Sequence, residues 1–189
     1  MEEAKLIITI ASAIIAVAAV LLARQQFALA RKVLIDNHDY SRRLYASQLI
    51  SQWDEKTLSS RQAVMSHWAA CFNQNLKIEW NLIDAVRQKQ LEQRKELPDS
   101  PTHPPLITDQ MARILNFLEL VATSALNGVA DEDILKQSFE ITLNRWYLIL
   151  EDFRSHLKTQ RGYEPWGPLK RLHANWHPDD ESKAKTGSA

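Results

Sequence analysis

The stretch ITDQMARILNFLELVATSALNG, residues 107–128, decides the fold class of this 189-residue chain. Its apolar residues recur every three or four positions, so they share one face of an α-helix. Thr108 or Asp109 is expected to cap that helix, and Asn127-Gly128 to end it, because glycine readily adopts the left-handed conformation that closes a helix. The apolar face consists of Ile107, Met111, Ile114, Leu115, Leu118, Val121, Ala122 and Ala125.

A second amphipathic segment begins at Asp131 and is predicted to run as one helix to Gly162. Because only a short turn separates it from the first, the two helices should pack as antiparallel neighbours. Its apolar face contains Leu135, Phe139, Thr142, Trp146, Ile149, Phe153 and Leu157.

The other segments extend this pattern. Helical spacing continues over a juxtamembrane segment at 24–53, with a break expected at 36–39, and further helices are predicted at 58–72 and 76–97. A proline-rich linker at 98–105 separates these from the two amphipathic helices. A short helix at 169–176 should be held to the bundle by Trp166 and Trp176, and the polar segment 177–189 should be a disordered tail. No segment alternates with a period of two, so we expect an all-α bundle over residues 54–176.

Composition excludes several classes of site. Lys and Arg together number 23, and so do Asp and Glu, which leaves no basic surplus for gripping nucleic acid. The single cysteine excludes a disulfide framework and a Cys-rich zinc site. None of the six histidines stands in a metal-ligand motif, so we expect no metal, no cofactor and no small-molecule ligand.

Residues 6–23, LIITIASAIIAVAAVLLA, carry no charge and predict a transmembrane helix in a lipid bilayer. A cleaved signal peptide is the alternative, but the preceding residues 1–5 are acidic where a signal peptide is basic. Basic residues such as Arg24 and Arg31 follow the apolar run, so residues 1–5 should lie on the extracytoplasmic side of the membrane and the carboxyl-terminal part in the cytoplasm.

Small residues form a seam along this apolar helix. Such seams let helices approach closely in lipid, which predicts a homo-oligomer or another membrane protein as partner. The alternative is that an alanine-rich helix shows a seam by chance. The seam consists of Ser12, Ala16, Ala19 and Ala23.

The segment ILNFLELVATSALNGVADEDILKQSF, residues 114–139, carries a family resemblance, together with Arg161 and the segment YEPWGPLKRL at 163–172. It resembles a bacterial family known as domain of unknown function 4760. The resemblance implies bacterial origin, one amino-terminal helix in the inner membrane, a helical cytoplasmic domain and no assigned chemistry. A neighbouring family is labelled putative phage abortive infection.

Glu119 is the polar residue that most needs explanation, because it lies on a largely apolar helix face. A buried carboxylate must be paired or raise its pKa. We expect a structural ion pair with Arg145 or Arg161 from a neighbouring segment, and a ligand-binding or catalytic role is the alternative.

The sequence favours a non-enzymatic interaction or scaffold module, confined to the inner face of a membrane. The alternative is a phage-defence effector, with Arg61 and His67 as the catalytic pair of an all-α ribonuclease. Arg61 and His67 share a predicted helix at the spacing of such a pair, but this spacing also arises readily by chance.

Overall fold

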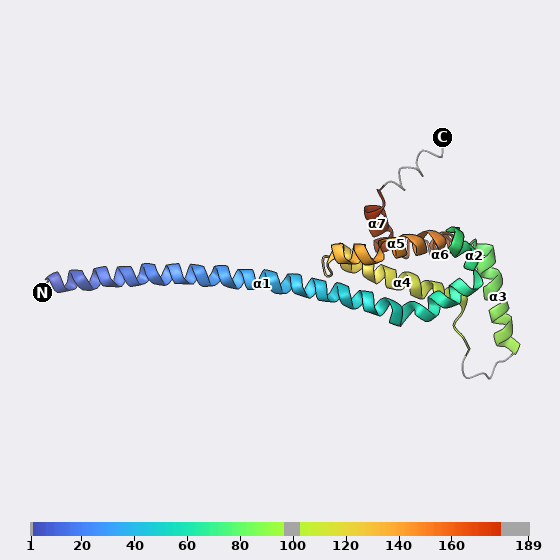
Figure 1. Ribbon diagram of the computed structural model, residues 1–189, viewed down its shortest axis with the longest axis horizontal. Coiled ribbons are helices and arrows are strands. Elements are labelled where there is room, and N and C mark those ends of the chain that lie inside the picture. The colour runs from blue at the N-terminus through green and yellow to red at the C-terminus, as the bar shows by residue number, and fades with distance from the viewer. Residues whose placement is uncertain (1, 97–102, 179–189) are drawn as a thin grey trace. The chain divides into compact units, whose positions relative to one another are not determined.

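The computed structural model describes residues 2–96 and 103–178, with side chains from residue 19 onward, and every regular element in these ranges is helical. The predicted all-α class is therefore confirmed (Figure 1). The helices are α1 (Glu2–His67), α2 (Ala69–Gln74), α3 (Trp80–Glu96), α4 (Ile107–Leu126), α5 (Glu132–Ile149), α6 (Glu151–Arg161) and α7 (Gly167–Trp176).

The chain divides into two units, residues 1–41 and 42–189. In the first unit, every side chain from Ala19 to Ser41 is exposed. Two members of the predicted seam, Ala19 and Ala23, are among these exposed residues, whereas the side chains of Ser12 and Ala16 lie outside the described part. Exposed large apolar side chains of this unit are Val20, Leu21, Leu22, Phe27, Leu29, Val33, Leu34, Ile35 and Tyr40.

The prediction of a membrane anchor needs correction. Within the part of the chain that the structure describes, no helix combines the length and the apolar character needed to cross a membrane. In the described part of α1, charged residues recur at Arg24, Arg31, Lys32 and Asp36, so this part holds no long uncharged apolar stretch. The predicted single-pass topology, with its location in a bacterial inner membrane, is therefore wrong on this test. The side chains of residues 6–18 of the predicted span lie outside the described part of the chain.

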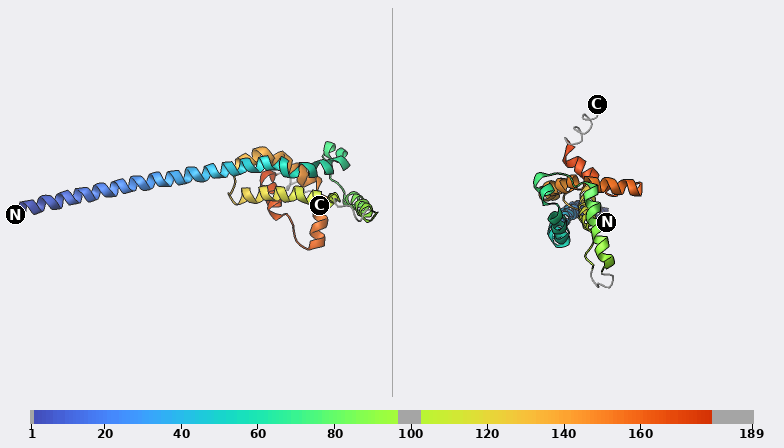
Figure 2. Two further views of the ribbon diagram at one scale, coloured as in Figure 1. Left: turned by 90° about the horizontal axis from the view of Figure 1, so that it is seen from below. Right: turned by 90° about the vertical axis from the view of Figure 1, so that its right-hand side faces the viewer.

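In the second unit, α4 forms the centre of the bundle and contacts α3, α5 and α7 (Figure 2). All eight residues of its predicted apolar face are buried, which confirms the face read from residues 107–125. Burying one Leu, Ile or Met side chain contributes about 1.5–3 kcal/mol, so this face makes a large contribution to the stability of the bundle. The last part of α1 packs on the same core through Trp53, whose ring lies 5.5 Å from Phe117 of α4 and 5.8 Å from Phe139 of α5.

The helix boundaries differ from prediction at several places. The predicted helix at 58–72 is interrupted at Trp68, and the one predicted at 76–97 begins only at Trp80. α1 continues without a break through residues 36–39 and through Thr57, the residue before the helix predicted at 58–72. The hydroxyl of Thr57 donates to the carbonyl of Trp53 one turn earlier, so it is used inside the helix rather than at an end.

Another difference is a break at Leu150, where one helix was predicted from Asp131 to Gly162. The carbonyl of Ile149 accepts a hydrogen bond from the backbone N–H of Ile78 at 3.0 Å. That carbonyl is thus engaged by a distant segment, and α5 ends at Ile149 before α6 begins at Glu151. The predicted ends at Asp131 and Gly162 are confirmed: Asp131 caps α5 by accepting from Ile134 N–H, and Gly162 has a φ of 76°.

α7 is held to α4 and α5 by polar bonds at both of its ends. Trp166 donates its indole N–H to Asn116 of α4 at 3.0 Å, and Trp176 donates to Glu132 of α5 at 3.0 Å. Both indoles are otherwise buried, so the two tryptophans fix the short helix on the bundle as predicted.

Candidate functional site

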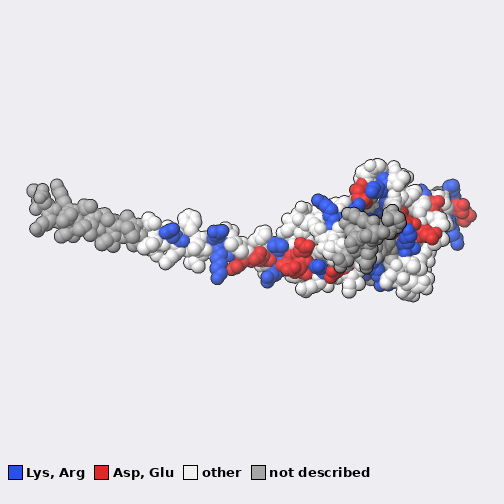
Figure 3. Space-filling model, turned by 90° about the horizontal axis from the view of Figure 1, so that it is seen from above, with Lys and Arg blue, Asp and Glu red and all other residues white. Residues whose placement is uncertain are grey.

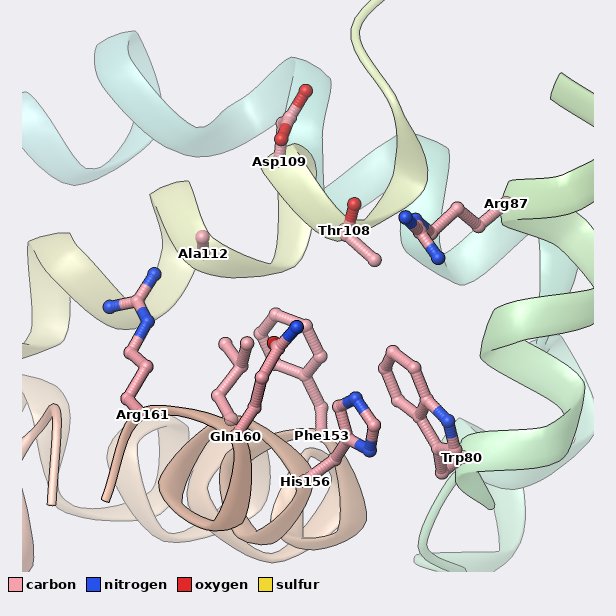
Figure 4. A pocket seen from close by; sticks show the side chains of 10 residues that line it. Trp80, Arg87, Thr108, Asp109, Ala112, Phe153, His156, Gln160 and Arg161 are labelled. Carbon is pink, nitrogen blue, oxygen red and sulfur yellow. The ribbon is translucent and has the colours of Figure 1, made fainter. Parts of the chain in front are cut away.

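A cavity of about 210 Å³ opens between α3, α4 and α6 (Figure 4). It combines an apolar floor with polar side chains that enter from three different helices. The lining residues are Trp80, Arg87, Thr108, Asp109, Ala112, Phe153, His156, Leu157, Gln160 and Arg161.

Helical periodicity brings these residues to one place. On α6, the lining residues Phe153, His156 and Gln160 are spaced by three and four positions and share one face. On α3, Trp80 and Arg87 are seven positions apart, which is two helical turns, so they also point the same way. The first turn of α4 supplies the rest of the rim through Thr108.

An aromatic stack forms one wall of the cavity. The imidazole of His156 lies flat on the indole of Trp80, with ring centroids 3.6 Å apart and planes inclined by 7°. Phe153 lies behind this pair, 6.4 Å from Trp80. Within the described ranges, the ring nitrogens of His156 have no hydrogen-bond or ion-pair partner, so the stack holds the ring while leaving its nitrogens available.

Two arginines supply positive charge from opposite sides. Figure 4 shows the guanidinium groups of Arg87 and Arg161 directed toward the cavity from α3 and from the end of α6. Arg87 forms an ion pair with Asp84 at 3.1 Å, so its positive charge is partly neutralised. Arg161 is exposed, and among the described residues no carboxylate lies within ion-pair distance of it.

The acidic residue at the rim, Asp109, is already engaged. Its carboxylate accepts the backbone N–H of Leu106 at 3.3 Å, at the amino terminus of α4, and Figure 4 shows it directed away from the cavity. The predicted cap at Thr108 or Asp109 is therefore wrong in position: Leu106 is the N-cap residue, and Asp109, three positions later, accepts the Leu106 N–H. Apart from Asp109, the side chains that line the cavity are cationic or neutral.

The floor gives the cavity its apolar character. Phe153 is 1% exposed, and Ala112 and Leu157 complete a hydrocarbon surface beneath the polar rim. Pockets for drug-sized ligands measure about 300–1,000 Å³, so this cavity suits a smaller molecule. An arginine fork next to an apolar surface is suited to a carboxylate that carries a hydrocarbon body.

The predicted ion pair of Glu119 is not present. Glu119 accepts the backbone N–H of Leu169 at 2.7 Å, and among the described residues no ion pair joins it to Arg145 or Arg161. The reason is that the first turn of α7 presents N–H groups without partners inside their own helix. Burial raises the pKa of Glu119, and the Leu169 N–H and nearby Arg171 oppose that rise.

The two arginines expected near Glu119 have other roles. Arg145 donates to the carbonyl of Phe72, and its guanidinium lies 5.6 Å from the centre of the Phe72 ring. Arg161 lines the cavity described above. Sequence reasoning thus named a residue of the site, Arg161, but for a different role.

The proposed ribonuclease residues, Arg61 and His67, are not brought together. Arg61 pairs with Asp54, and its guanidinium lies 4.6 Å from the centre of the Trp53 ring. His67 is exposed, and its ring lies 5.5 Å from that of Trp68. Six positions along a helix place the two side chains on different faces, so the motif does not form a shared site.

Most of the cavity was missed because its residues come from three separate segments. Trp80, Arg87 and His156 looked like ordinary surface positions of their own helices. The shared spacing of Phe153, His156 and Gln160 was the one local signal available. In the described ranges no three His, Cys, Asp or Glu side chains gather as metal ligands.

Figure 3 shows basic and acidic side chains interspersed over the described part, without a broad field of one sign on the face shown.

No curated protein and no solved structure matches the chain. The family model described as a domain of unknown function, DUF4760, matches residues 6–176, which is most of the sequence. The chain therefore belongs to the family of domain of unknown function 4760, as the segments at 114–139 and 163–172 indicated.

Proposed function

We propose that residues 42–176 form a non-enzymatic binding module whose α3–α4–α6 cavity takes the carboxylate of a small organic acid. One observation carries this proposal. Arg87 and Arg161 enter from opposite sides of a cavity with an apolar floor, next to His156, whose ring nitrogens have no partner in the described structure.

The chemistry of the rim supports a carboxylate. Arg161 has no acidic partner among the described residues, so its planar set of donors can bind both oxygens of a carboxylate. His156 and Thr108 add further hydrogen-bonding groups on the other sides. The apolar floor of Phe153 and Leu157 is suited to a short hydrocarbon chain or ring.

Binding is favoured over catalysis by the environment of His156. A catalytic histidine is normally oriented by a third group and lies within reach of the nucleophile that it activates. In the described structure, the only partner of the His156 ring is the Trp80 indole, and the hydroxyl of Thr108 donates no hydrogen bond to a base. The cavity thus offers recognition groups without an activated nucleophile.

The test compares hexanoate with hexanol, which has the same chain but no charge, by isothermal titration calorimetry. We expect hexanoate to bind and hexanol to bind at least tenfold more weakly. Arg161→Met should weaken hexanoate binding by about tenfold or more, because a hydrogen bond to a charged group contributes about 1.5–3 kcal/mol.

Arg113→Met is the matched control, because Arg113 is exposed on α4 and does not line this cavity. It should leave the affinity unchanged. Equal binding of hexanol and hexanoate, or equal weakening by the two arginine variants, would overturn the proposal.

A further inference from the structure

Arg154 of α6 is a buried cation without an acidic partner. It is 7% exposed, and in the described part of the chain no carboxylate lies within ion-pair distance of its guanidinium. That group lies 3.5 Å from the centre of the Tyr147 ring, and Nη2 donates to the Tyr147 carbonyl at 3.1 Å. Nε is buried and has no hydrogen-bond partner among the described residues.

This arrangement leaves the buried Nε–H donor of Arg154 unused. Arginine carries five N–H donors, and a buried charge is costly when its donors are not satisfied. Contact with the Tyr147 ring offsets part of this cost through the cation–π interaction. An anion that reached the guanidinium would offset the rest.

A cavity of about 260 Å³ gives access to this arginine from the side of α7. Lys170 of α7 lies on its rim, is exposed, and has no carboxylate within ion-pair distance among the described residues. Ser155 adds a hydroxyl. This cavity shares no lining residue with the α3–α4–α6 cavity, although both use α6.

Two acidic residues also lie at this cavity and limit what can bind. Glu164 pairs with Lys158 at 3.5 Å, so its charge is largely neutralised in place. Glu151 is exposed on the rim and opposes an anion. The cations Arg154, Lys158 and Lys170 still outnumber these two carboxylates.

We propose that the cavity at Arg154 binds the phosphate group of a small phosphate monoester. A phosphate dianion accepts several hydrogen bonds from one guanidinium and pairs with lysine ammonium groups as point charges. The cavity volume fits a small monoester. The proposal is independent of the carboxylate site, because it depends on different side chains.

The experiment uses ¹⁵N NMR of the protein and follows the Nε–H resonance of Arg154. Inorganic phosphate and ethyl phosphate are titrated separately at constant ionic strength, with acetate as a carboxylate of similar size. We expect saturable shifts with phosphate and with ethyl phosphate, and at least tenfold weaker binding of acetate.

The variants separate a binding role from a structural one. Arg154→Met keeps an apolar side chain over Tyr147 and should abolish saturable phosphate binding, which is then followed on the amide of Ser155. Lys170→Ala changes an exposed residue and should weaken binding severalfold even if Arg154→Met does not fold. Arg161→Met should leave phosphate binding unchanged, so a failure of the carboxylate proposal is distinguishable from a failure here.

Three results would overturn the proposal: no saturable shift with phosphate, exclusion of ethyl phosphate while inorganic phosphate binds, or unchanged affinity in a folded Arg154→Met protein or in Lys170→Ala.

Discussion

The side chain of Glu119, from the middle of α4, accepts the backbone N–H of Leu169 at 2.7 Å and thereby caps the amino terminus of α7. A carboxylate at this end of a helix satisfies an unpaired donor and interacts favourably with the helix dipole. Because α4 is also the centre of the core, this one bond ties the last helix of the bundle to its most buried element.

Replacing Glu119 with alanine should lower the free energy of unfolding by about 1 kcal/mol, as the loss of a helix cap does. Glu119→Gln keeps an oxygen that can accept from Leu169, so it should be close to the wild-type protein. Urea unfolding of the two variants measures the difference. Equal destabilisation by Ala and Gln would mean that the charge, and not the acceptor, makes the contribution.

Glu119 should also give stability a dependence on pH. Burial raises its pKa in the folded protein, so the folded state holds this proton more tightly than the unfolded state does. Its contribution therefore favours folding at low pH and is lost as pH rises from about 4, near the ordinary glutamate value, through the raised folded pKa.

This pH effect is measured as the difference in unfolding free energy between the wild-type protein and Glu119→Gln. The contributions of the other carboxylates to the pH dependence cancel in that difference. The wild-type protein should lose stability relative to the variant as pH rises through this window. A difference that is constant, or that changes in the opposite direction, contradicts the assigned environment of Glu119.

The core of α4 offers a matched pair of leucines. Leu118 is 0% exposed and Leu120, two positions later, is 41% exposed. Leu118→Ala should lower the free energy of unfolding by about 2–5 kcal/mol, because it leaves a cavity in a packed core. Leu120→Ala should change it by about 0.5 kcal/mol or less. Similar costs for the two variants in thermal or urea unfolding would contradict the assigned orientation of α4.

Tyr147 reports on the Arg154 guanidinium that covers its ring. Burial raises the pKa of the Tyr147 phenol, and the charge of Arg154 partly counteracts this rise. Arg154→Met removes the counteracting charge, so the pKa of Tyr147 should rise further. Titration of the tyrosines by ultraviolet absorbance or NMR measures it, with Lys136→Met on α5 as a control. An unchanged or lower pKa in Arg154→Met would contradict the contact.

The parts of the fold that local periodicity determines could be predicted from the sequence. The buried face of α4 followed from its spacing, and Gly162 and Asp131 marked helix ends because their preferences are local. The break at Leu150 could not be predicted, since it depends on a bond from Ile78, which is distant in the sequence.

The partner of Glu119 was missed for a related reason. An arginine is the usual partner of a buried carboxylate. Here the carboxylate of Glu119 instead accepts a backbone N–H from the first turn of α7, residues 167–169. The candidate site could not be predicted from local patterns, because its residues come from separate segments. Only the packing of three helices brings together Trp80, Arg87, Thr108 and His156.

The most direct test of the central claim follows the indole N–H resonance of Trp80 while hexanoate is added, with Trp80→Phe identifying the signal. Trp80 lines the cavity and stacks on His156 at 3.6 Å, so a bound ligand must change its environment. We predict a saturable shift that Arg161→Met weakens about tenfold and Arg113→Met leaves unchanged. A Trp80 resonance that does not move with hexanoate, while other resonances do, would contradict a carboxylate site in this cavity.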